Sequence, residues 1–172
     1  RFLVGREAEM AAVAQARDYW EEGRSVSILV AGARGSGKTS FLNCACSAVL
    51  GDYPVVSGQF HERITTAAGM RSFLSSFLHV DAADLNPALQ SEKRLVVLEE
   101  VERTFIRRPG GFEGLRTLLN LISATSKHTL WILSLNEVAL RYLARIVAME
   151  EHFSHRINAM AVPPLHLRNA IL

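Results

Sequence analysis

A glycine-rich segment between an apolar stretch and a helical stretch limits the fold of this chain most strongly. Residues 32–39 read GARGSGKT and fit the pattern G-x-x-x-x-G-K-[ST] in full. The preceding SVSILVA at 25–31 is too short for a buried helix and predicts a buried strand. Residues 36–50 predict a helix, which Gly51-Asp52 ends. This order of strand, loop and helix predicts a phosphate-binding loop rather than a chance glycine-rich turn.

The residue types in this loop suit a nucleotide. Glycines let backbone N–H groups turn toward phosphates, and a helix N-terminus adds a favourable dipole. We expect Lys38 to neutralise β- and γ-phosphate charge, and the Thr39 hydroxyl to bind Mg²⁺. The pattern predicts nucleotide binding without naming the reaction. The predicted binding residues are Gly32, Ala33, Arg34, Gly35, Ser36, Gly37, Lys38, Thr39 and Ser40.

Strand-like and helix-like segments alternate along the rest of the chain. With 172 residues, the chain suits one α/β domain. The alternation predicts a parallel sheet covered on both faces. Residues 81–93 are mixed, with Asn86-Pro87 as a turn or a helix start. Further strands are predicted at 53–58, 95–98, 129–134 and 157–162, and helices at 7–20, 70–78, 112–122 and 139–146.

Two glutamates follow the predicted strand at 95–98. In RLVVLEE, residues 94–100, we expect Glu99 to support Mg²⁺ and Glu100 to orient the attacking water. Glutamate is one methylene longer than aspartate, which moves the carboxylate by about 1.5 Å. Because Mg²⁺ demands near-ideal geometry, Glu99 would need a bridging water, or turnover would suffer. The alternative is a solvated charge cluster that continues through Glu102 and Arg103.

Asn136 ends the predicted strand that begins at 129. Ligands of open α/β sheets collect at the carboxyl ends of the strands, so Asn136 can hold the attacking water or a γ-phosphate oxygen. It can also cap the helix that starts near Glu137. The two roles are compatible.

Charge and cysteine content bear on partners and location. The net charge of +2 is too small to indicate nucleic acid by itself. Arg103, Arg107 and Arg108 can contact phosphates, form a solvated loop or neutralise nearby acids. The spacing of Cys44 and Cys46 suits neither a zinc site nor a disulfide, which favours small core residues of a reduced, cytoplasmic protein. No apolar run approaches the ~18 residues of a membrane span.

Taken in order, these motifs resemble the additional-strand (ASCE) P-loop ATPases, and within them the AAA+ and STAND groups. The resemblance rests on FLVGRE at 2–7, Walker A at 32–39, a Walker B-like strand at 95–100, the sensor-1-like Asn136, and FSHR at 153–156 before Pro163-Pro164-Leu165. It implies a three-layer αβα fold, with a five-stranded parallel sheet in the order 5-1-4-3-2. The nucleotide-binding core would span 1–164, and 165–172 would begin a truncated lid helix.

The resemblance also implies ligands and partners. It places adenine near Val4 and Gly5, with ATP and Mg²⁺ as cofactors, and makes Arg156 an arginine finger. A surface or salt-bridging arginine is the alternative for Arg156. The implied partners are ATP or ADP, together with further copies of the chain or other domains of the full-length protein.

Three functions fit these expectations. The first is an ATP-binding and ATP-hydrolysing switch or motor within a larger protein. The second is a nucleic-acid-linked ATPase, such as a replication or transposition helper, and the third is an ATP-binding scaffold without turnover. A GTPase is disfavoured because no N-K-x-D motif is present, and an ABC ATPase because no L-S-G-G-Q-like segment is present.

Overall fold

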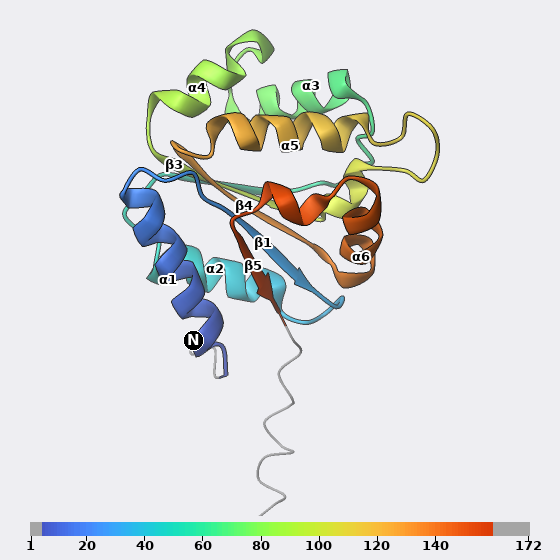
Figure 1. The fold of residues 1–172 in the computed structure, drawn as a ribbon. Helices are drawn as coiled ribbons and strands as arrows, with labels where there is room; N and C mark the ends of the chain where they lie inside the picture. Colours follow the sequence, from blue (N-terminus) through green and yellow to red (C-terminus); the bar gives the residue numbers. More distant parts are fainter. Residues whose placement is uncertain (1–4, 160–172) are drawn as a thin grey trace, which may run out of the picture.

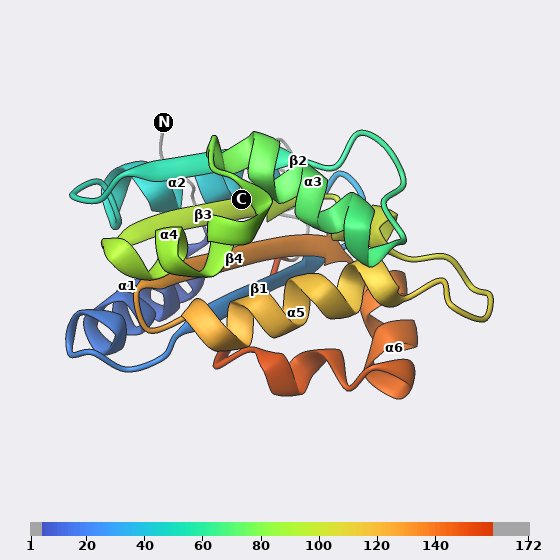
Figure 2. The ribbon, with the colours of Figure 1, turned by 90° about the horizontal axis from the view of Figure 1, so that it is seen from above.

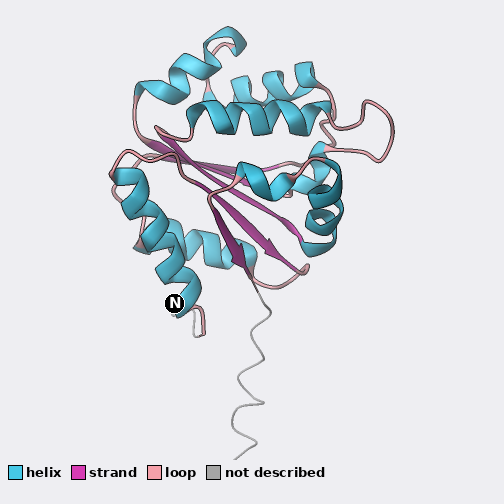
Figure 3. Cartoon of the chain, viewed as in Figure 1, coloured by secondary structure: helices cyan, strands magenta, loops and turns pink. Residues whose placement is uncertain are grey.

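Five parallel strands form the centre of the computed structural model, which describes residues 5–159 (Figures 1 and 3). Their order is β2-β3-β4-β1-β5, which confirms the predicted sheet. Every neighbouring pair is parallel. The strands are β1 Ser27–Gly32, β2 Val55–Gln59, β3 Arg94–Glu99, β4 Thr129–Asn136 and β5 His155–Asn158.

Helices cover both faces of this sheet, and the three predicted layers are therefore present. On one face, α1 (Glu7–Glu21) and α2 (Lys38–Ala48) pack against Ile28, Val30 and Ile132. On the other, α3 (Ala67–Leu78), α4 (Leu85–Ser91), α5 (Glu113–Thr125) and α6 (Glu137–Ile146) pack around Trp131 and Leu133. In Figure 2, which is seen from above, α3, α4 and α5 lie in front of the sheet strands as part of this second layer. Among residues 5–159, no helix is long and apolar enough to cross a membrane.

Short 3₁₀ turns complete the connections between these elements. They are η1 Ala82–Asp84, η2 Val101–Thr104 and η3 Met149–His152. The mixed segment at 81–93 contains η1 and α4, so Asn86-Pro87 lies in a helix start rather than a turn. Proline is tolerated there because first-turn N–H groups have no intrahelical partner.

The fifth strand begins two residues earlier than the predicted 157–162. Ser154 Oγ accepts a hydrogen bond from the Ser27 N–H at 3.0 Å, which holds this end of the strand against β1. Only Ile157 is buried on β5, because the strand lies at the sheet edge. A search for an apolar run therefore misses its polar first half. The predicted residues 160–162 and the lid helix at 165–172 lie outside the described residues.

Parallel pairing brings the predicted site residues to one edge of the sheet. Gly32 at the end of β1 pairs with Asn136 at the end of β4. Gln59 at the end of β2 pairs with Glu99 at the end of β3. The carboxyl ends of β2, β3 and β4, which are far apart in sequence, therefore lie at the same edge of the sheet as the glycine-rich loop.

Candidate nucleotide-binding site

A polar cleft of about 530 Å³ opens at this carboxyl edge. The cations at its wall are Arg34, Lys38, Arg63 and Arg103, and the carboxylates are Glu99, Glu100 and Glu102. The remaining polar lining includes Gly35, Gly37, Thr39, Ser40, Ser134 and Asn136. The cleft thus combines positive charge suited to phosphates with oxygen ligands suited to a hard divalent cation.

The glycine-rich loop turns directly into α2. Gly37 is the N-cap residue and has φ 84°, a left-handed conformation that favours glycine. Gly32 has another requirement: a Cβ there would overlap the carbonyl oxygen of Ala159 and lie 2.6 Å from Ser36 Oγ. Ala33 and Ser36 shape the loop, with the Ser36 N–H donating to the Ala33 carbonyl at 3.1 Å. The loop therefore presents the N-terminus of an 11-residue helix to the cleft.

Lys38 lies across the loop that precedes it. Its Nζ donates to the carbonyls of Gly32 and Ala33, each at 3.0 Å. The ammonium group is thereby held over the loop, where phosphate oxygens can replace these two carbonyls as acceptors. This position fits the predicted charge-neutralising role.

Thr39 and Glu99 meet across the cleft. The Thr39 hydroxyl donates to Glu99 Oε2 at 2.6 Å, although the two residues are 60 positions apart. A hydroxyl and a carboxylate at this distance fit one octahedral Mg²⁺ with its remaining positions held by water and phosphate oxygens. Bound there, Mg²⁺ would offset charge on the phosphates of ATP during transfer.

Glu100 occupies an unusual backbone conformation. Its φ is 60°, one of three positive values at non-glycine positions among residues 5–159. At Glu100 the backbone turns away from the direction of β3. The Glu100 carboxylate lies 3.8 Å from Arg103 Nε. Glu100 lines the cleft and is about half exposed, so that water can reach its carboxylate, and the water-orienting role stays a prediction.

Asn136 shows the capping alternative directly. Its Oδ1 accepts the Ala139 N–H at 2.7 Å at the start of α6. Its Nδ2 donates to Glu102 Oε1 at 2.9 Å. The sequence analysis named Glu102 only as part of a possible charge cluster, but in the structure η2 brings its carboxylate to Asn136. The sequence signal for this position was its spacing of three residues, about one helical turn, after Glu99.

Arg6 is a second residue that the sequence analysis did not assign. It is 3% exposed and lies beneath the loop, where Nη2 donates to the Ser36 carbonyl at 2.5 Å. Its guanidinium also lies 5.9 Å from the Phe41 ring centroid. Arg6 therefore ties the start of α1 to the phosphate loop. Gly5 does not line the cleft, and Val4 lies outside the described residues.

Arg156 is held by ion pairs on the edge strand. Its Nη1 lies 2.6 Å from Glu150 Oε1 and its Nη2 lies 3.5 Å from Glu137 Oε1. The salt-bridging alternative for Arg156 is thus present. Its side chain does not line the cleft of its own chain, and the arginine-finger role stays a prediction about a neighbouring subunit.

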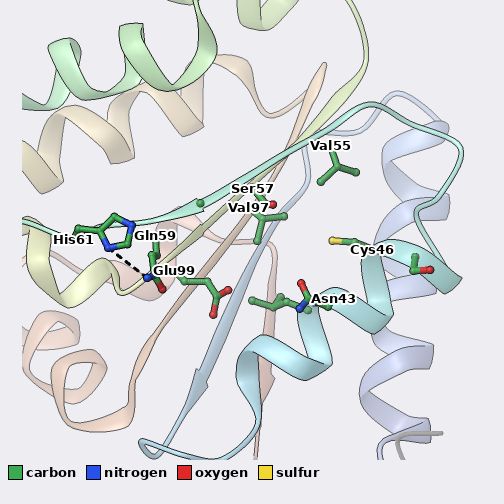
Figure 4. Close-up of a pocket in the computed structure, with 11 residues that line it drawn as sticks. Asn43, Cys46, Val55, Ser57, Gln59, His61, Val97 and Glu99 are labelled. Carbon is green, nitrogen blue, oxygen red and sulfur yellow. Dashed lines mark hydrogen bonds between the residues drawn. The ribbon is translucent and has the colours of Figure 1, made fainter. Parts of the chain in front are cut away.

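A second cavity lies on the other side of Glu99. It has a volume of about 460 Å³ and lies between α2 and β2, with Asn43, Cys46, Ser57 and Glu99 in its wall (Figure 4). Burial, together with the Glu99 charge, raises the pKa of the Cys46 thiol. Cys44 and Cys46 are free thiols and half-buried, whereas the sequence favoured core residues.

Comparison with known proteins places this geometry in a family. The family model described as "AAA ATPase domain" matches residues 3–134. The chain belongs to the AAA ATPase domain family. The predicted ASCE, AAA+-like fold is therefore confirmed. No curated protein matches the sequence significantly.

Solved structures of AAA+ type share the fold at low identity. The ORC2 protein of Aeropyrum pernix has a TM-score of 0.63 at 16% identity, covering 91% of this chain and 48% of that chain. Cdc6p of Pyrobaculum aerophilum has a TM-score of 0.65 at 14% identity, covering 92% and 46%. The ORC1 protein of Aeropyrum pernix, solved in complex with DNA, has a TM-score of 0.64 at 16% identity, covering 98% and 48%. The chain spans about half the length of these proteins.

Proposed function

We propose that this AAA ATPase domain binds Mg-ATP in the carboxyl-edge cleft and hydrolyses it as a regulated switch or motor of a larger protein. The contact of Thr39 with Glu99 supports this most strongly, because it joins the phosphate loop to the strand that ends in acids. ATP phosphates would lie along the loop and Lys38, with Mg²⁺ at Thr39 and Glu99. Glu100 would orient the attacking water.

Ligand-dependent stability tests the binding half of this proposal. At 100 times its Kd, Mg-ATP should raise the free energy of unfolding by about 2.7 kcal/mol. The Lys38→Ala variant should lose this gain, because the cation over the loop is removed. Thermal unfolding with and without Mg-ATP measures both. The exposed Lys127, at the opposite end of β4, supplies the control variant Lys127→Ala, which should keep the gain. An equal shift in Lys38→Ala would contradict the site.

Nucleic-acid-linked ATP hydrolysis is a second candidate, favoured by one loop. The segment between η2 and α5 projects beyond the helices in both views and carries the exposed Arg107 and Arg108 (Figures 1 and 2). The Arg107 guanidinium stacks 4.2 Å from the Tyr142 ring centroid, which holds it at the surface. Arg103 instead binds the His61 carbonyl at 2.9 Å and pairs with Glu100. The DNA in the Aeropyrum pernix ORC1 structure supports the idea by analogy.

Salt dependence tests this second candidate. If Arg107 and Arg108 contact phosphates, log K for duplex DNA should fall with log salt, and replacing both with alanine should lower the slope by about 2. Fluorescence anisotropy from low to moderate salt measures this slope. Arg24→Ala, which changes an exposed arginine at the opposite edge of the sheet, is the control. A flat response in the unaltered protein would contradict nucleic-acid binding.

The remaining proposals are a scaffold without turnover, membership of the STAND group, self-association and a cytoplasmic location. The scaffold differs from the switch only in hydrolysis. Single-turnover kinetics of the full-length protein therefore separate the two.

A further inference from the structure

Two hydrogen bonds fix the orientation of the Asn136 carboxamide, one at Oδ1 and one at Nδ2. The Ala139 backbone N–H can only donate, so it faces Oδ1, and the Glu102 carboxylate accepts, so it faces Nδ2. Rotating the amide by half a turn would break both bonds. One of the two Nδ2 protons is used by Glu102, and the other has no partner among residues 5–159. Because Asn136 lines the cleft, this second proton is available to a ligand there.

Glu102 is held firmly enough to impose this orientation. It belongs to η2, whose Val101 and Thr104 are both fully buried. The Thr104 hydroxyl donates to the Val101 carbonyl at 2.7 Å and closes the turn. Glu102 Oε2 is itself buried and has no hydrogen-bond partner in the described part of the chain. A carboxylate in this position costs free energy unless it serves a partner, which points to a role beyond surface charge.

Two neighbouring acids take different positions at the cleft. Glu100 follows β3 directly, is about half exposed and pairs with Arg103. Glu102 has a buried carboxylate oxygen and accepts a hydrogen bond from Asn136 at the end of β4. The Glu102 carboxylate therefore orients a neighbouring side chain, whereas the Glu100 carboxylate remains open to solvent.

We propose that Glu102 is a positioning residue for ATP hydrolysis, which acts through Asn136. It holds the carboxamide so that the second Nδ2 proton faces the γ-phosphate or the attacking water. This inference rests on the proposed hydrolysis of ATP in this cleft. In this proposal η2 connects the acidic end of β3 to Asn136 at the end of β4.

Substitutions at Glu102 separate a positioning role from other roles. Glu102→Ala leaves the Ala139 N–H as the one remaining restraint on the carboxamide among the described residues, and we expect the single-turnover rate to fall by roughly tenfold to a hundredfold, since misplacement of one group costs about that much. Glu102→Gln keeps an acceptor oxygen for Asn136 and should recover most of the lost rate. The Kd for Mg-ATP should change by less than about threefold in both, because the phosphate loop is untouched.

The full-length protein is assayed with Mg-ATP for both rate and Kd. Glu62→Ala, which removes an exposed acid with no hydrogen bond or ion pair among residues 5–159, should match the unaltered protein. Recovery by Glu102→Gln with constant Kd supports the proposal. Equal loss in Glu102→Gln and Glu102→Ala would overturn it and indicate proton transfer by Glu102. An unaltered rate in Glu102→Ala would overturn it too. Failure of the unaltered protein to bind Mg-ATP, or binding without turnover, would instead contradict the proposed function.

Discussion

Replacing Glu100 with glutamine is expected to slow single-turnover ATP hydrolysis by about 10²–10⁴-fold while Mg-ATP binding persists. A carboxylate that orients water and takes up its proton contributes about this factor to a rate. Glutamine keeps the size and the hydrogen-bonding oxygen of Glu100 but cannot take up a proton at neutral pH. Rapid-quench measurement of γ-phosphate release by the full-length protein, with enzyme in excess over ATP, gives the rate.

The ion pair of Glu100 with Arg103 supplies a matched control for this experiment. Arg103→Ala removes the same ion pair, in which both side chains are about half exposed, but leaves the carboxylate in place. Its effect on the rate should be smaller, because exposed ion pairs contribute little. Equal rates for Glu100→Gln and the unaltered protein would eliminate Glu100 as the catalytic group and favour the scaffold.

Trp131→Ala is expected to lower the free energy of unfolding by about 3–5 kcal/mol. Trp131 is 0% exposed at the middle of β4, the strand that carries Asn136 to the cleft. Its indole Nε1 donates to Thr125 Oγ1 at 2.9 Å on α5. Truncation leaves a large cavity between sheet and helix as well as losing this hydrogen bond. Urea denaturation followed by circular dichroism measures the change.

Trp131→Phe separates the two contributions. Phenylalanine keeps most of the ring but loses the donor, while Thr125 Oγ1 still donates to the Leu121 carbonyl at 2.7 Å. The loss should therefore be well below that of alanine, with about 1 kcal/mol from the hydrogen bond. A change of less than 1 kcal/mol in Trp131→Ala would mean that the α5 face of the sheet is not a close-packed core.

The sheet could be predicted because three of its strands carry a physical signature. β1, β3 and β4 are buried along most of their length, so they appear as apolar runs, and the loop after β1 fixes where the sheet binds its ligand. β5 could not be bounded this way, because an edge strand buries one residue in four and alternates with polar groups. Sequence periodicity reflects the burial of side chains, and edge strands bury few of them.

The site was predictable wherever a motif stands next to a strand end. Lys38, Thr39, Glu99, Glu100 and Asn136 all lie in or at the cleft for this reason. Glu102, Arg63 and Arg6 were not assigned, since their positions depend on how turns fold back after the strands. Arg63, for example, reaches the cleft from the loop after β2 and donates to the Phe105 carbonyl at 2.8 Å.

The close approach at Gly32 has a mechanical consequence. Ala159 donates its N–H to the Ala31 carbonyl at 2.6 Å, and its own carbonyl oxygen sits where a side chain at 32 would lie. No compressible side chain separates the two backbones at this point. Any displacement of the phosphate loop toward β5 must therefore move the backbone at Ala159 by a similar amount, so that this contact works as a rigid linkage between the phosphate loop and the end of β5.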